Sequence, residues 1–481
     1  MRGRRGEALA ALPLHVTAGA AGTGIGVLVI VRPMAGIGAA LALVPIALLT
    51  LREGLRPLLA WALAALLTGY MFLDRGFAHV GAPPLYVGDA VLGLAFLTVV
   101  AVVRRPRLTA LHWLVIAFMG LGAARTIPFL STDGTTALRD ATIWGYAAFA
   151  LALSFILVRA DVTRVLGWYR KLVIPFLCWA PLGLLATTML SIPAAPGSDV
   201  SLVSLKGGDI AVQLAGIAAF VLLGLYSGDR PRLGRETLLW PLWVAGVAIA
   251  GSGNRGGLLA IMLAVGVVLA LRVRSARRIG FVAAIAVVVV VASFVNPSVG
   301  GWGARSVSLG QLERNALSIG GGGGGSLNGT REFRLRWWSK IAHYTFEGPY
   351  FWTGKGFGIN LADSDGFQVA ADHSLRAPHN THMTVLARMG VPGLALWAML
   401  QIGFGASLLR ATRRARRTGE RFWTQVNSWI FVLWLAMLVN TSFDPYLEGP
   451  QGSIWFWCVF GFGLAVLRLQ RERSDATEAP A

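Results

Sequence analysis

A histidine and several arginines stand where apolar stretches of this chain begin or end, and these residue types can act on hydroxyl and phosphate groups. In RAPHNTHMTVLARMGVPG, from Arg376 to Gly393, His379 follows a proline and precedes an apolar helix that begins near Asn380 or Thr381. A neutral imidazole there can take a proton from a sugar hydroxyl near pH 7. His379 is therefore a candidate general base, and a structural or capping role is the alternative.

The arginines have the chemistry of a phosphate site. Arg255 lies in GSGNRGG, where glycines allow close backbone approach, and a guanidinium binds phosphate oxygens through two parallel hydrogen bonds. The alternative is an arginine that reaches to an ordinary lipid headgroup. In TREFRLRWW, Arg331 and Arg334 would share a helix face with Trp338, which offers cations beside an aromatic surface for sugar rings, and Arg336 follows. An interfacial helix with tryptophans at headgroup level is a compatible reading.

Two carboxylates, Asp444 and Glu448, stand in the turn NTSFDPYLEGP. They would orient an arginine or contact acceptor hydroxyls, and a plain solvated turn is the alternative. The histidines His373, His379 and His382 suggest a metal site at first sight, but no compact set of acidic or cysteine partners accompanies them. We therefore expect no metal and no other cofactor.

The composition places these residues in a membrane protein. Hydrophobic residues make up 55% of the 481 residues and charged residues 14%, and stretches such as FVAAIAVVVVVASFV are apolar on every face. The formal charge of +20 comes from short Lys and Arg clusters between the apolar stretches. That spacing is typical of cytoplasmic loops, so we expect no nucleic-acid partner.

At about 20 apolar residues for each crossing, the sequence predicts an all-α polytopic bundle of about 12 to 14 spans. The predicted spans lie near residues 16–31, 34–50, 57–73, 86–103, 108–124, 141–158, 172–190, 209–226, 238–252, 256–271, 279–296, 390–409, 422–440 and 453–468. With both termini cytoplasmic, the large basic clusters fall inside. Arg125, Arg255, the arginines of TREFRLRWW, His379 with Asn380, and the acidic turn then share the outer side.

One long connection divides the chain. We expect an N-terminal transmembrane bundle over 1–296, an extracytoplasmic loop over 297–389, and C-terminal transmembrane helices with a cytoplasmic tail over 390–481. Within the loop, SIGGGGGGSLNGT predicts a flexible linker. The aromatic and charged segment after it predicts an ordered part with interfacial helices.

Taken in order, these stretches resemble the O-antigen ligase and O-antigen polymerase superfamily. The resemblance rests on SGNRGGLLA, FRLRWW, TGKGFG, PHNTH and GVPG, and it covers roughly residues 247–461. It implies a variant of the integral-membrane glycosyltransferase fold in the bacterial cytoplasmic (inner) membrane. The implied enzyme moves a glycan from an undecaprenyl pyrophosphate carrier to an acceptor hydroxyl on the outer face, with inversion and without a metal.

The resemblance also implies roles for residues and partners. Arg255 and Arg334 would bind the pyrophosphate leaving group, and Arg331 is the alternative to Arg334. His379 would activate the acceptor hydroxyl. Two positions depart from the family pattern: Met383 stands where a leucine is usual, and Arg388 would add a contact to phosphate. The implied partners are a lipid-linked oligosaccharide donor, a glycan or lipid-glycan acceptor, and other glycan-export proteins. A transporter or flippase of lipid-linked glycans is the alternative, although no internal repeat is visible.

Overall fold

The structure is a computed structural model of the whole chain. It describes residues 52–82, 85–195, 198–227, 236–271, 277–283, 285–286, 298–299, 307–308 and 326–478. The predicted spans at 16–31 and 34–50, most of the span at 279–296, and the glycine run of the predicted linker lie outside these residues. The division into three domains stays a prediction.

The described elements are helices apart from two pairs of two-residue strands. In chain order they are α3 (Arg52–Leu73), α4 (Arg75–Ala78), β1 (Gly81–Ala82), β2 (Leu85–Tyr86), α5 (Val87–Val102), α6 (Ala110–Ala124), η1 (Ile127–Phe129), α7 (Leu130–Asp133), α8 (Thr135–Asp140), α9 (Thr142–Gly145), α10 (Ala147–Ile156), α11 (Arg159–Met189), α12 (Gly207–Leu222), α14 (Leu239–Gly253) and α15 (Arg255–Ala270). They continue with β3 (Ser298–Val299), β4 (Val307–Ser308), α18 (Ser326–Phe346), α19 (Leu361–Asp365), α20 (Thr381–Arg417), α21 (Arg421–Asn440), η2 (Tyr446–Glu448) and α22 (Pro450–Glu478). Each strand pair is antiparallel.

Six helices of the described residues are long and apolar enough to cross a membrane, and five shorter helices are also apolar. Each predicted span that falls within the described ranges coincides with one of these eleven segments. α11 begins at Arg159, well before the predicted start at 172, because its polar first turns continue the helix beyond the apolar stretch. The protein is therefore a multi-pass membrane protein with an all-helical architecture.

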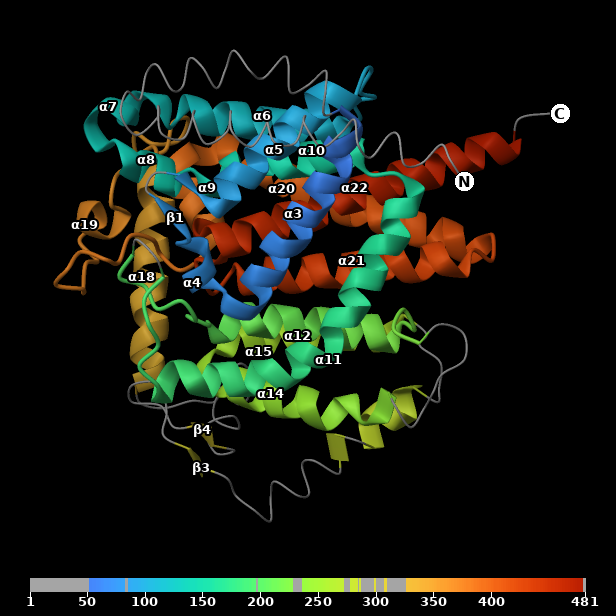
Figure 1. Cartoon of the computed structure of the whole chain (residues 1–481). Helices are drawn as coiled ribbons and strands as arrows, with labels where there is room; N and C mark the ends of the chain where they lie inside the picture. The colour runs from blue at the N-terminus through green and yellow to red at the C-terminus, as the bar shows by residue number, and fades with distance from the viewer. Residues whose placement is uncertain are drawn as a thin grey trace, which may run out of the picture.

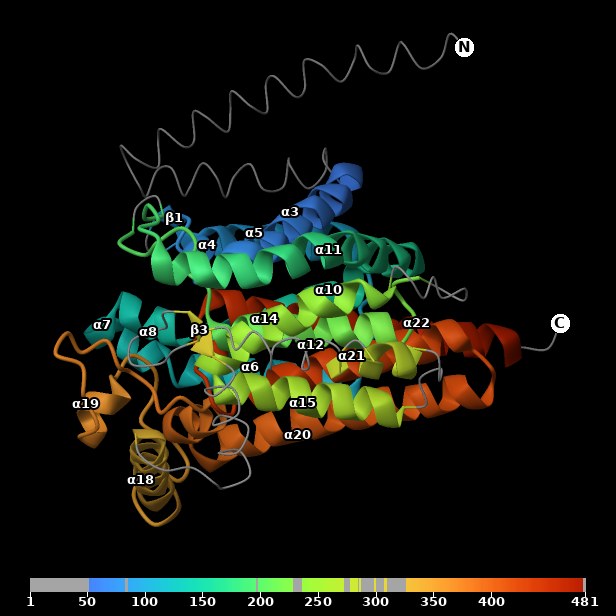
Figure 2. The same ribbon diagram turned by 90° about the horizontal axis from the view of Figure 1, so that it is seen from below.

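The predicted loop contains a helix that lies across the others. Most of the long helices run side by side, and α18 crosses their ends at the left of Figure 1 and is seen nearly end-on in Figure 2. We refer to this end of the molecule as the α18 end. The segment Ser326–Thr330, predicted as the last part of the flexible linker, is instead the start of α18. Helix propagation from an ordered neighbour explains this difference, because adding a residue to an existing helix costs far less than starting one.

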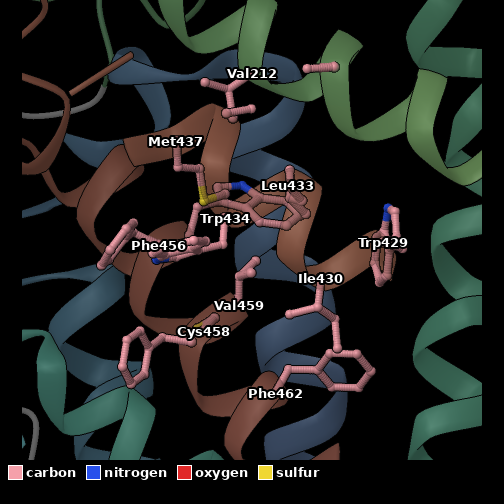
Figure 3. Packing of buried hydrophobic residues seen from close by; sticks show 14 of the residues in the cluster. Val212, Trp429, Ile430, Leu433, Trp434, Met437, Phe456, Cys458, Val459 and Phe462 are labelled. Atoms are coloured by element: carbon pink, nitrogen blue, oxygen red, sulfur yellow. The ribbon is translucent and has the colours of Figure 1, made fainter. Parts of the chain in front are cut away.

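Aromatic and aliphatic side chains of most of the long helices build the interior, with many of them on α12, α21 and α22. Figure 3 shows Trp434 of α21 near Phe456 of α22, and the ring of Trp429 contacts Phe462 of α22. The indole N–H groups find acceptors on other helices: Trp429 donates to the Gly216 carbonyl oxygen at 3.1 Å and Trp434 to Gln401 Oε1 at 2.9 Å. Buried polar groups in an apolar interior need such partners, so these bonds help to fix how the helices pack.

α20 joins a short helix and a membrane span through a kink at Gly390. This residue has φ 67° and ψ −166°, a conformation that is open essentially only to glycine. A Cβ atom at this position would lie 2.4 Å from the Phe351 carbonyl oxygen. The kink lets the first turns of α20 stay at the α18 end while the rest of the helix joins the bundle.

We expect the substitution Gly390→Ala to lower the melting temperature of the purified protein. A Cβ would meet the Phe351 carbonyl, and the backbone conformation itself would cost alanine about 1 to 3 kcal/mol. The matched control is Gly266→Ala in α15, where no atom lies within 4 Å of the added Cβ. Equal melting temperatures for the two variants would contradict the account of the kink.

Candidate active site

His379 lies in the turn that leads into α20 and has a φ of 54°. Positive φ is uncommon for residues other than glycine and persists only where the surroundings hold it. On one side, Trp338 of α18 donates from Nε1 to the Pro378 carbonyl oxygen at 2.9 Å. On the other side, the Thr381 amide donates to the Thr441 carbonyl oxygen at 2.9 Å. Contacts from two elements therefore fix the position of this histidine.

Asn380 is the N-cap of α20. Its side-chain oxygen accepts hydrogen bonds from the amides of His382 at 2.9 Å and Met383 at 3.2 Å. The predicted helix start is confirmed, and the cap is Asn380 rather than Thr381. Because the cap occupies the side-chain oxygen, only the side-chain nitrogen of Asn380 is left for a substrate.

The two histidines of PHNTH differ in how their rings are bonded. His382 accepts a hydrogen bond at Nδ1 from Trp397 Nε1 at 2.9 Å, and its Nε2 donates to Ser442 Oγ at 3.0 Å. Both of its nitrogens are therefore used. Within the described residues, the His379 ring makes no hydrogen bond and is only partly buried. Of these two rings, only that of His379 is available to a substrate.

The charges around His379 favour its neutral form. Burial and the nearby cations Arg334 and Lys206 together lower the pKa of His379 to about 4, although the carboxylate of Asp444 acts in the opposite direction. At pH 7 the imidazole is uncharged and can accept a proton. Arg334, Lys206 and Asp444 are thus the charged groups that act on this ring.

Arg334 reaches this site from α18. Its Nη1 donates to the Phe443 carbonyl oxygen at 2.9 Å, in the turn that follows α21. The helix predicted for TREFRLRWW is confirmed, so Arg331 lies one turn before Arg334 on the same face. Arg331 and Arg336 are exposed. Of the three arginines, Arg334 is the one that the structure brings to the turn beside His379.

Arg255 is the first residue of α15, at the tip of the hairpin between α14 and α15. The residue before it, Asn254, caps the helix: its Oδ1 accepts a hydrogen bond from the Gly257 amide at 2.8 Å. The Nδ2 of the same side chain donates to Asp444 Oδ2 at 3.2 Å. One asparagine thus ties the arginine hairpin to the turn that also contacts Arg334.

Phe443 joins the two arginine segments. Its carbonyl oxygen accepts the hydrogen bond from Arg334, and its Cβ lies 2.5 Å from where a Cβ on Gly256 would stand. Gly256 directly follows Arg255, so the glycine permits a backbone approach that a larger residue would block. The structure therefore gathers the Arg255 hairpin, Arg334 and the turn beside His379 at the α18 end.

Three charged residues at this site were absent from the sequence prediction: Asp74, Lys206 and Asp209. Lys206 Nζ lies 3.8 Å from Asp444 Oδ1, and the Lys206 amide donates to Asp74 Oδ2 at 2.8 Å. Asp74 and Asp209 are buried. For Lys206 the sequence contains one pattern that could have identified it: like Arg255, it precedes two glycines and an apolar stretch.

Arg388 lies in a different group of side chains. It is only 2% exposed, and its Nη1 donates to the carbonyl oxygens of Gly356 and Ile359, each at 3.1 Å. Its Nη2 lies 2.9 Å from Asp140 Oδ2, an atom that Arg376 also contacts at 2.9 Å. The guanidinium is fully used by protein acceptors. We therefore assign Arg388 to holding the loop over residues 353–360, rather than to the predicted phosphate contact.

Arg125 also faces this loop. Its Nη2 donates to the Gly354 carbonyl oxygen at 3.4 Å, and its own carbonyl oxygen accepts a hydrogen bond from the Phe357 amide at 3.1 Å. Gly354 has a φ of 59°, and a Cβ there would lie 2.3 Å from the Arg388 carbonyl carbon. The TGKGFG segment is thus clamped between α6 and α20, away from the contacts of His379.

The turn that carries Glu448 is packed, so the solvated-turn alternative is wrong. Its residues Tyr446 and Leu447 are buried. Thr384 of α20 donates from Oγ1 to Glu448 Oε1 at 2.8 Å. Burial raises the pKa of Glu448 to about 7, against the lowering effect of the Thr384 hydrogen bond and of Arg388. Glu448 contacts the first helical turn after His379, whereas Asp444 contacts the arginine hairpin.

Fold and site together define a class: a multi-pass helical membrane protein with a histidine and cations gathered at one end of the bundle. Residues 240–398 match the family model described as O-antigen ligase, which confirms the resemblance. The match contains Arg255, Arg334 and His379. This part of the chain is an O-antigen ligase domain, and the protein is a membrane enzyme of the glycosyltransferase kind. No curated protein matches the chain.

We expect Arg388→Met to destabilise the protein without directly weakening donor binding. The substitution keeps most of the volume but leaves two carbonyl oxygens unpaired and removes one of the cations of Asp140, at a cost on the order of 3 kcal/mol. Melting temperature and limited proteolysis of the 353–360 loop measure this loss. Arg331→Met, which removes an exposed charge, should leave both unchanged. Normal stability of the Arg388 variant with weakened donor binding would show that Arg388 contacts the donor.

Proposed function

We propose that the protein transfers an oligosaccharide from an undecaprenyl pyrophosphate carrier to an acceptor hydroxyl, as a glycan polymerase or ligase. The observation that carries this proposal is the imidazole of His379, which makes no hydrogen bond to any described residue and is kept neutral by burial and by Arg334. The O-antigen ligase match supports a lipid-linked glycan as the donor. The roles of single residues below are part of the proposal.

The reaction balances with one base. The His379 ring takes the proton of the acceptor hydroxyl while the hydroxyl oxygen attacks the anomeric carbon of the donor sugar. The bond from that carbon to the phosphate oxygen breaks, and its electron pair leaves with the lipid pyrophosphate, which gains one negative charge. Attack from the side opposite the leaving group inverts the anomeric configuration.

Arg255 and Arg334 are proposed to stabilise the leaving group. Arg334 donates to the Phe443 carbonyl oxygen, and Gly256, the residue after Arg255, approaches Phe443 closely. We therefore place both guanidinium groups on the oxygens of one pyrophosphate. Because the negative charge grows during bond breaking, these cations bind the transition state more strongly than the donor. In this scheme the arginines supply the positive charge, and no metal ion is required.

The site is proposed to face the outside of the cytoplasmic membrane, with both chain termini inside. The arginine-rich end of α20 and the end of α22 lie at the side of the bundle opposite α18 in Figure 1. Positively charged segments favour the cytoplasmic side. This orientation would give the enzyme access to lipid-linked glycans that have already crossed the membrane.

The second candidate, a transporter or flippase, is disfavoured by the match to an enzyme family. An assay of glycan transfer by the detergent-solubilised protein distinguishes the two. An enzyme would still form product, whereas a transporter would have no activity because detergent leaves no separate compartments. The acceptor decides between polymerase and ligase. Mass spectrometry of surface glycans would show accumulated single repeat units if a polymerase is lost.

We expect His379→Ala to lower kcat for glycan transfer from a purified lipid-linked donor by about 10² to 10⁴, because the general base is lost. Donor binding should remain, since the arginines are unchanged. His373→Ala is the matched control, because His373 is exposed and contacts Asp363 on the loop surface. Undiminished transfer by the His379 variant would contradict the general-base role.

The pH dependence gives a separate test. His379 must be neutral to act, so kcat/KM should be flat from about pH 5 to 8 and fall as the pH drops through about 4. Replacing Arg334 by Gln removes a cation that lowers this pKa. The pKa should therefore rise, and the acid limb of the kcat/KM profile should move to higher pH.

Arg331→Gln removes the same charge one helical turn away and should leave the limb in place. If the limb does not move with Arg334→Gln, or moves equally in both variants, the limb does not report His379.

A further inference from the structure

We propose that Lys206 is a third cation of the diphosphate site and that Asp444 is its counter-ion before the donor binds. The inference deepens the proposed function and rests on it, because it assumes a polyprenyl diphosphate as the ligand at the α18 end. Lys206 lies between α11 and α12, outside the residues that match the family model.

Lys206 and Arg255 occupy equivalent places on two neighbouring helices. Each stands directly before or at the start of a helix and is followed by a pair of glycines, in Lys206-Gly207-Gly208 and Arg255-Gly256-Gly257. α12 and α15 lie side by side in Figures 1 and 2. A cation therefore begins each of two adjoining helices at the same end of the bundle.

The glycines bring these two helix starts into close contact. A Cβ on Gly257 would lie 3.2 Å from Gly208 Cα and 2.7 Å from Ala211 Cβ. A Cβ on Gly208 would lie 2.9 Å from Asn254 Nδ2, the side chain that caps α15. The backbones can approach this closely only because side chains are missing. Lys206 is consequently held near the hairpin that carries Arg255.

The ammonium group of Lys206 is available to a ligand. Its side chain is 33% exposed, and its ion pair with Asp444 spans 3.8 Å, longer than a hydrogen bond. Within the described residues Nζ makes no hydrogen bond. By contrast, Lys340 donates to the Asp365 carbonyl oxygen at 2.7 Å, and Lys355 is paired with the Asp365 carboxylate. Those two lysines stabilise the loop, whereas Lys206 keeps its donors free.

The surroundings keep Lys206 charged and in place. Burial lowers its pKa, but the carboxylates of Asp444, Asp209 and Asp74 outweigh that effect and raise it, against the cation Arg75. Other charged or titratable groups of the described residues near the site are His379, Arg334, Glu448, Tyr446 and the hairpin residue Arg255.

Asp74 fixes the backbone at this position. It adopts a φ of 52° and accepts the Lys206 amide hydrogen bond. Positive φ in a residue other than glycine indicates that the surrounding contacts hold this geometry. We therefore describe Asp74 as a positioning residue for Lys206.

A diphosphate oxygen at hydrogen-bond distance would replace the long contact to Asp444. Asp444 would retain its hydrogen bond from Asn254 Nδ2, so its carboxylate would stay partnered. The leaving diphosphate gains a negative charge as the glycosidic bond breaks, and an ammonium beside two guanidinium groups would share it. Lys206 should thus favour a diphosphate over a monophosphate, which presents fewer oxygens to the same cations.

The test compares binding of a polyprenyl diphosphate and a polyprenyl monophosphate of equal chain length to the full-length protein. Lys206→Met should weaken diphosphate binding by about tenfold or more and change monophosphate binding much less. Lys206→Arg should restore most of the affinity because it restores the charge. Lys171→Met is the matched control, since Lys171 is an exposed lysine of α11. Melting curves confirm that each variant is folded, and Lys206→Gln serves as a second neutral variant.

The outcomes separate the two proposals. If the wild-type protein binds diphosphate no better than monophosphate, the proposed diphosphate site itself fails. If the wild type discriminates and Arg334→Gln weakens diphosphate binding, but both neutral Lys206 variants bind as the wild type does, only the role of Lys206 is overturned. Equal weakening of both lipids by Lys206→Met would also overturn it, because the selectivity would then arise elsewhere.

Discussion

The carboxylate of Asp444 holds together elements that are far apart in the sequence. It accepts a hydrogen bond from Asn254 at the start of α15, and it pairs with Lys206 at the start of α12. It also acts on the charge of His379 before α20. The neighbouring Phe443 adds α18 through its bond with Arg334. A polar group in an apolar surrounding needs partners, and this need is what draws the ends of four helices to one place.

The cations of the α18 end fall into two sets with different roles. Arg388 and Arg376 are paired with Asp140, and Lys355 with Asp365, so their charges are used to hold the TGKGFG loop against α20. Lys206 has a long and partly exposed ion pair instead. A charge that is already neutralised at close range adds little to the binding of a phosphate. The division explains how one end of the protein can hold both a rigid loop and a site for an anion.

The sequence predicts the spans and the helix start at Asn380, because apolar length and capping are local properties. It also predicts the helix that carries Arg334 and Trp338. It does not predict the pairing of Arg388 with Asp140, since those residues are distant in the chain and meet only after folding. The same holds for Asp74 and Asp209, because Asp74 lies between α3 and α4 and meets Lys206 at the start of α12 only in the folded chain. The Lys-Gly-Gly motif can be read in the sequence. Only the close contact between α12 and α15 in the structure shows that it places Lys206 near the Arg255 hairpin.

The most direct test of the central claim is a cryo-electron microscopy structure of the His379→Ala variant with an intact lipid-linked oligosaccharide donor. The account predicts the diphosphate between Arg255 and Arg334, and the anomeric carbon facing the space that the missing imidazole would fill. A donor whose diphosphate lies at the opposite end of the bundle, or among the side chains around Asp140, would contradict it.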